Sequence, residues 1–167
     1  MINAPISVGE LIDKLSILQV KKKRILEESK LEFVNREFEI LYNLSAEYLN
    51  DLEIENLFHN LVEVNSILWD VEDKIREYEK SKSFSSHFIE LARKVYYTND
   101  KRFNLKNKIN EITNSEIREQ KSYQDYSETD SLETIDKWIF ESPDGGQTIY
   151  KRPFGAPHDK REKITNE

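Results

Sequence analysis

Two rows of polar side chains have the residue types and the helical spacing from which a binding site could be built. The first row steps by four and three residues through Asn65, Trp69, Glu72 and Arg76, with Asp73 beside it. Residues at these steps share one face of a helix. The second row belongs to a later helical segment and comprises Glu90, Arg93, Tyr97, Asn99, Asp100 and Arg102. Amides, carboxylates, cations and an indole ring can together hold a polar or anionic ligand.

The same residues have a structural interpretation that we weigh first. Pairs such as Glu72 and Arg76 are ordinary ion pairs of a solvated helix face. If the two rows lie on neighbouring antiparallel helices, counting from the turn between them places Arg76 level with Glu90 and Glu72 level with Arg93. We therefore expect one interhelical charged cluster, and it is the candidate ligand site.

A catalytic alternative uses the carboxylates Glu10, Asp13, Glu72 and Asp73. Mg²⁺ prefers one or two carboxylates plus the phosphates of a substrate, so these residues could serve a Mg²⁺-dependent hydrolase of phosphorylated nucleotides or nucleotide sugars. The order and spacing of the acidic motifs of all-α nucleotide pyrophosphohydrolases are absent. No phosphate-binding glycine loop and no nucleophile elbow occurs either. We expect no cofactor, with Mg²⁺ as the alternative.

Four amphipathic helices are predicted to carry these rows. A capping box at Ser7 and Glu10 begins the first helix, which ends near residue 26, and the others span about 31–50, 53–80 and 84–112. The third helix has the longest apolar seam. In the fourth helix, Thr98 and Arg102 place polar residues within the seam, but the apolar positions on either side of them keep the same register. We therefore favour a continuous fourth helix. The third-helix seam comprises Leu57, Leu61, Val64, Leu68, Val71, Ile75 and Tyr78.

The composition changes after residue 126. Residues 127–136 are predicted to be a linker, residues 137–152 a β-hairpin around an Asp-Gly-Gly turn, and residues 153–167 a disordered tail. The fold class is therefore mainly α: a four-helix antiparallel bundle over residues 6–126 with a small C-terminal β-hairpin.

Composition and charge limit the function classes. The formal charge of −7 disfavours nucleic acid as a partner, and the absence of cysteine excludes thiolate chemistry. No apolar stretch is long enough for a membrane span, so we expect a soluble, cytoplasmic protein. For the basic run from Lys21 to Arg24 we favour a complement to the helix dipole over an anion-binding patch.

Three segments together resemble an uncharacterised family of small helical proteins from marine bacteria, cyanobacteria and their phages. They read ISVGELIDK at 6–14, LWDVEDKIR at 68–76 and FIELARKVYYTND at 88–100, and the resemblance extends to residue 126. It implies an association with sugar transfer and surface polysaccharide, but no reaction. Residues 141–150, ESPDGGQTIY, are similar to a hairpin of small cyanophage proteins, which implies a phage chain acting in the host cytoplasm.

The continuous seams and the scarcity of catalytic motifs favour a non-enzymatic function. We expect a helical interaction or modulator module whose partner is another protein, including host proteins, or a second copy of the chain. The Mg²⁺-dependent hydrolase is the alternative.

Overall fold

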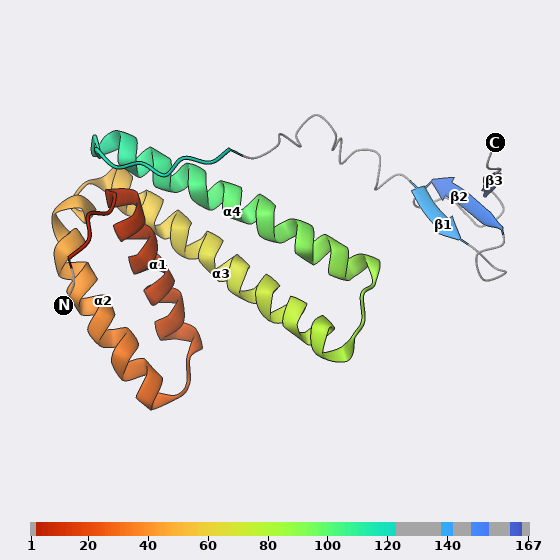
Figure 1. Ribbon diagram of the computed structural model, residues 1–167, viewed down its shortest axis with the longest axis horizontal. Coiled ribbons are helices and arrows are strands. Elements are labelled where there is room, and N and C mark those ends of the chain that lie inside the picture. The colour runs from red at the N-terminus through yellow and green to blue at the C-terminus, as the bar shows by residue number, and fades with distance from the viewer. Residues whose placement is uncertain (1–2, 123–137, 142–147, 154–160, 165–167) are drawn as a thin grey trace. The chain divides into compact units, whose positions relative to one another are not determined.

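The computed structural model describes residues 3–122, 138–141, 148–153 and 161–164 (Figure 1). The chain forms two compact units, Met1–Gln120 and Lys121–Glu167. The first unit is helical and the second contains the strands.

The helical unit confirms the predicted antiparallel bundle. Its elements are α1 (Val8–Arg24), α2 (Glu28–Leu49), α3 (Leu52–Ser81) and α4 (Ser86–Ile112). The Ser7 hydroxyl accepts a hydrogen bond from the Glu10 amide at the start of α1, and the Asp51 carboxylate caps α3 in the same way. Lys82 ends α3 in the left-handed conformation. The fourth helix is continuous through Thr98 and Arg102, as predicted.

Helices α1 and α3 each contact the three other helices of the bundle. Ile12 of α1 packs with Ile54, Leu57 and Leu61 of α3 and with Ile109 of α4 in a fully buried cluster. The seam predicted for α3 is therefore confirmed at its buried positions.

The lengths of the helices decide where this core ends. Helix α1 has 17 residues and spans about 26 Å, whereas α3 has 30 and spans about 45 Å. The α1–α2 pair therefore covers α3 and α4 at one end and diverges from them toward the other (Figure 1). Beyond that divergence α3 packs against α4, for example through Tyr78 and Phe88.

The second unit contains the predicted hairpin and one further strand. Strands β1 (Trp138–Glu141) and β2 (Ile149–Pro153) are antiparallel, with Trp138 opposite Pro153. Strand β3 (Glu162–Ile164) pairs with β2; it lies within the predicted tail and was not expected. The predicted linker and most of the tail fall outside the described residues.

None of the helices in the described part of the chain is long and apolar enough to cross a membrane.

Candidate functional site

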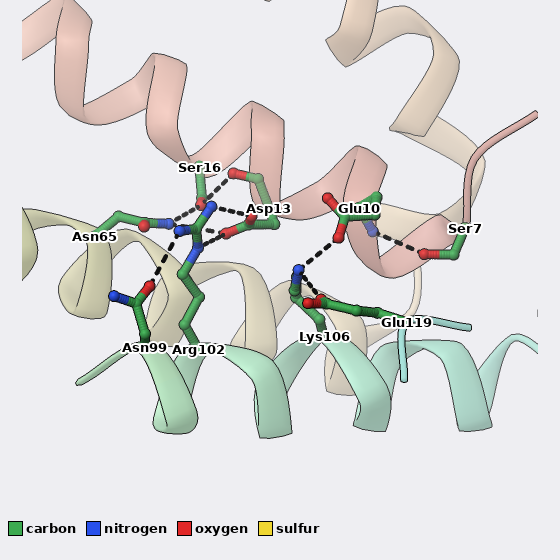
Figure 2. Close-up of polar contacts among 9 residues, drawn as sticks. All are labelled: Ser7, Glu10, Asp13, Ser16, Asn65, Asn99, Arg102, Lys106 and Glu119. Carbon is green, nitrogen blue, oxygen red and sulfur yellow. Dashed lines mark hydrogen bonds and ion pairs between the residues drawn. The ribbon is translucent and has the colours of Figure 1, made fainter. Parts of the chain in front are cut away.

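A buried ion pair joins α1 to α4 at the centre of the bundle. Arg102 donates two parallel hydrogen bonds to Asp13, from Nε to Oδ1 at 2.8 Å and from Nη2 to Oδ2 at 2.6 Å (Figure 2). The Asp13 side chain is 2% exposed and that of Arg102 is 25% exposed. The hydrogen bonds to Asp13 raise the pKa of Arg102 above its ordinary value. The polar interruption in the α4 seam is thus explained, because Arg102 neutralises a carboxylate that α1 buries.

Asn65 of α3 completes this network. Its Nδ2 donates to Asp13 Oδ1 at 3.0 Å and to Ser16 Oγ at 2.8 Å, while the Ser16 hydroxyl donates to the Asp13 carbonyl. A carboxylate only accepts hydrogen bonds, so the amide nitrogen must face Asp13 and the amide oxygen must point elsewhere. None of the described residues donates a hydrogen bond to the Asn65 Oδ1, although this residue is buried.

A second ion-pair group lies about one turn along the same two helices. Lys106 of α4 donates to Glu10 of α1 and to Glu119, which follows α4 in the chain, each at 2.5 Å (Figure 2). Burial lowers the pKa of Lys106, but the hydrogen bonds to both carboxylates more than offset this, and the net pKa is raised. Glu10 therefore bonds Lys106 instead of closing the predicted capping box.

Helices α1 and α4 approach each other closely at Gly9, in the first turn of α1. The Gly9 amide donates to Asn110 Oδ1 at 2.7 Å. A Cβ at Gly9 would overlap the Lys106 carbonyl oxygen and crowd that amide oxygen. A glycine in the first turn of α1 is thus required by packing against the α4 backbone.

Beside the Asp13–Arg102 pair, α1, α3 and α4 line a cavity that is open to solvent. We call it the fork cavity. Its volume is about 230 Å³. Trp69 and Glu72 of α3 contribute to its wall, and Asn65 and Arg102 reach it from the buried network. The full lining is Ile17, Val20, Lys21, Asn65, Leu68, Trp69, Glu72, Asn99 and Arg102.

The charges around the fork cavity are unevenly balanced. Arg102 is neutralised by Asp13, and Glu72 is paired with Arg76 at 2.8 Å. Lys21 forms no ion pair with the carboxylates of the described residues. Nearby, Arg24 bonds Asp70 at 2.9 Å and thereby ties the end of α1 to α3. The cavity wall therefore has one uncompensated positive charge.

Five of the predicted site residues line this cavity: Asn65, Trp69, Glu72, Asn99 and Arg102. The others lie elsewhere, because α1 does not cover the distal parts of α3 and α4. Arg76 pairs with Glu72 and Asp73 of its own helix. Glu90 pairs with His87 within α4, and Arg93 donates to the Tyr97 hydroxyl at 3.4 Å. Asp100 also belongs to α4, outside the cavity lining.

The predicted interhelical pairs Arg76–Glu90 and Glu72–Arg93 were wrong. The prediction used height along the helices without the rotation of each row about its helix axis. In the structure Arg76 and Glu90 are exposed, and each bonds a residue of its own helix. The ion pairs that do join helices are Asp13–Arg102 and Glu10–Lys106.

The four carboxylates of the catalytic alternative are not brought together. Asp13 bonds Arg102 and Glu10 bonds Lys106, while Glu72 and Asp73 are exposed on α3 beside Arg76. Within the described part of the chain, no three Asp, Glu, His or Cys side chains are grouped so that they could hold a metal ion.

Sequence reasoning missed several residues of the site. Lys21 was read as part of a solvated basic run, yet it lines the cavity. Ser16, Lys106 and Asn110 gave no separate signal, since each is an ordinary residue on a helix. The one available signal was the polar pair Thr98 and Arg102 within the apolar seam of α4, which indicated a buried partner without saying where it lay.

Comparison with known proteins adds a family and no activity. Residues 2–136 match the model of a family of unknown function. No curated protein and no solved structure matches the chain.

Proposed function

We propose that this chain, which belongs to the family of unknown function DUF6165, is a non-enzymatic helical module. Its ligand is one small, hydroxyl-rich anion, which binds in the fork cavity. The observation that carries the proposal is the orientation of Asn65. Asp13 fixes its amide nitrogen, and its Oδ1 accepts no hydrogen bond from the described residues. Asn65 lines the cavity, so this oxygen can accept a hydrogen bond from a ligand hydroxyl that replaces water there.

The remaining lining suits the same ligand class. The Trp69 ring offers an apolar face with a polar edge, onto which the C–H face of a sugar ring can pack. The Asn99 amide and the Glu72 carboxylate can bond hydroxyl groups, and Lys21 supplies the charge for a carboxylate or phosphate. Ile17, Val20 and Leu68 are the aliphatic residues of the lining.

The size of the cavity decides between candidate ligands. Pockets for drug-sized ligands measure about 300–1,000 Å³, and the fork cavity is smaller, at about 230 Å³. A single acidic or phosphorylated sugar ring fits this size better than an entire nucleotide or nucleotide sugar. The substrates of the hydrolase alternative are therefore the less suitable occupants.

The state of the carboxylates supports binding without catalysis. A general base or a metal ligand needs an available carboxylate, whereas Asp13 bonds Arg102 and Glu10 bonds Lys106. We propose that the ligand belongs to sugar or surface-polysaccharide metabolism, as the resemblance over residues 6–126 implies. The module would act in the cytoplasm by modulating a partner protein, a host protein if the chain is phage-encoded.

Trp69 provides the readout of the test. In a Trp138→Phe background it is the one tryptophan of the chain, and its fluorescence is titrated with glucuronate, glucose 1-phosphate and glucose. We expect both anions to bind more tightly than glucose. Lys21→Gln should reduce that preference about tenfold, which corresponds to about 1.4 kcal/mol.

Lys23→Gln is the matched control, because Lys23 belongs to the same basic run and does not line the cavity. Equal losses for the two variants would mean that long-range charge, and not the cavity, attracts the ligand. Absence of binding for all three sugars would overturn the ligand class. Mg²⁺-dependent phosphate release from nucleotides or sugar phosphates would overturn the non-enzymatic assignment.

A further inference from the structure

Arg102 has hydrogen-bond donors that the buried network does not use. A guanidinium carries five N–H groups, and Arg102 donates two of them to Asp13, from Nε and from Nη2. A third, on Nη1, points to Asn99 Oδ1 at 3.5 Å, which is at the limit of a hydrogen bond (Figure 2). Nη1 and Nη2 therefore each keep one N–H group without an acceptor among the described residues.

The unused acceptor of Asn65 lies near these unused donors. The Asn65 Nδ2 and the Arg102 Nε donate to the same atom, Asp13 Oδ1, at 3.0 and 2.8 Å, so the two side chains are neighbours. Both also line the fork cavity. A pair of guanidinium N–H groups is complementary to a carboxylate, and an amide oxygen is complementary to a hydroxyl group. The two residues together suit a ligand in which a carboxylate and a hydroxyl group are close together.

The charges of the lining suit an anion with a single charge. Asp13 neutralises Arg102. Arg76 neutralises Glu72, which leaves Lys21 as the one unbalanced charge of the described lining. A carboxylate carries one negative charge at pH 7, whereas a phosphate monoester carries about 1.5 to 2. The carboxylate is therefore the closer match.

Glu72 disfavours the second charge of a phosphate. Its side chain lines the cavity, whereas Arg76 pairs with it from outside the lining, so the negative partner of this pair is the nearer one. The cavity volume is about 230 Å³. A sphere of that volume is about 8 Å across, which is about one Debye length at physiological ionic strength. Salt therefore does not fully screen the bound anion from Glu72.

We propose that the ligand of the fork cavity is a uronic acid, and that Arg102 and Glu72 select it over other sugars. This inference rests on the proposed function, because it names the ligand of the same cavity. The carboxylate accepts from Nη1 and Nη2 of Arg102 at once, which is the two-bond geometry that this guanidinium also uses with Asp13. A ring hydroxyl donates to Asn65 Oδ1, and Lys21 supplies the net attraction.

Three sugars that differ at one ring substituent test the ligand with an unaltered cavity. Glucuronate, glucuronamide and glucose 6-phosphate carry a carboxylate, a neutral amide and a phosphate on the same side of the ring, and Trp69 fluorescence in the Trp138→Phe background reports their binding at pH 7. We expect glucuronate to have a Kd about tenfold below that of either other sugar. Glucose 6-phosphate that binds as tightly as glucuronate would overturn this inference and leave the proposed function standing. If none of the three binds, the proposed function fails as well.

Glu72→Gln tests the discrimination against phosphate. The variant should reduce the preference for glucuronate over glucose 6-phosphate to less than threefold, because it removes the repulsion of the second charge. Glu77→Gln is the matched control, since Glu77 forms an exposed pair with Lys74 on the same helix and does not line the cavity. An equal change in both variants would assign the effect to net charge and overturn the role of Glu72.

Arg102→Lys tests the recognition of the carboxylate. Lysine keeps a positive charge beside Asp13 and lacks the paired N–H groups, so the preference for glucuronate over glucuronamide should fall at least fivefold. Arg24→Lys is the control, because Arg24 bonds Asp70 outside the cavity lining. Circular dichroism confirms that each variant is folded. A purely structural role of Arg102 would weaken both sugars equally, and an unchanged preference would overturn the assignment.

Discussion

The Asp13–Arg102 pair allows a stability prediction that depends on the geometry of the site. In Arg102→Met the aliphatic stem is kept and the guanidinium is removed. Asp13, whose side chain is 2% exposed, then loses both hydrogen bonds from Arg102 and retains the one from Asn65. The variant therefore leaves a buried carboxylate with one of its three side-chain hydrogen bonds.

The expected cost follows from the number of bonds and from their burial. Hydrogen bonds to charged groups contribute about 1.5–3 kcal/mol each, and breaking one side of a buried pair costs about 3–5 kcal/mol. The partial exposure of Arg102 admits some water to Asp13, so we expect about 3–4 kcal/mol. Arg76→Met, which removes an exposed pair with Glu72, should cost at most about 1 kcal/mol.

Urea unfolding at pH 7, followed by circular dichroism, measures both variants. With a slope of about 2 kcal/mol per molar, Arg102→Met should lower the midpoint by about 2 M. The double variant Asp13→Leu with Arg102→Met should be more stable than Arg102→Met alone, because it leaves no unpaired charge. The reasoning is refuted if Arg102→Met costs no more than Arg76→Met, or if the double variant is less stable than the single one.

Three further predictions concern neighbouring parts of the bundle. Leu68→Ala removes a buried seam residue and should cost about 2–5 kcal/mol in urea unfolding; a loss below about 0.5 kcal/mol would mean that the register is wrong. Gly9→Ala should destabilise by about 1–3 kcal/mol through overlap with the α4 backbone, and stabilisation, as helix propensity alone predicts, would contradict the close approach. Because the pKa of Lys106 is raised by folding, its stabilising contribution is complete below the unfolded value of about 10.4 and is lost as pH rises through the folded pKa. The difference in unfolding free energy between the wild type and Lys106→Met should therefore be constant from pH 7 to about 10 and shrink above it. A difference that grows with alkaline pH would refute the raised pKa of Lys106.

The sequence predicts the elements well because each helix carries its own evidence. The α3 seam, the Ser7 cap and the uninterrupted register of α4 are local patterns, and the structure confirms them. The third strand was missed because Glu162–Ile164 is too short to show an alternating pattern.

The pairing of side chains between helices could not be read in the same way. Whether Glu72 meets Arg93 depends on the rotation of α3 and α4 about their axes and on how much of α3 is covered by α1, and neither quantity is local. In the structure α1 and α3 each contact the three other helices.

The position of α1 also connects the stability of the bundle with binding at the fork cavity. Asn65 and Arg102 each bond Asp13 and each line the cavity, so their orientation is set before a ligand arrives. Fixed donors and acceptors lower the entropic cost of binding. A ligand that contacts them binds the folded chain alone, and at a concentration of one hundred times its Kd it would stabilise that state by about 2.7 kcal/mol. The increase in the unfolding midpoint should disappear in Arg102→Met and persist in Arg76→Met, because only Arg102 lines the cavity and holds α1 in place.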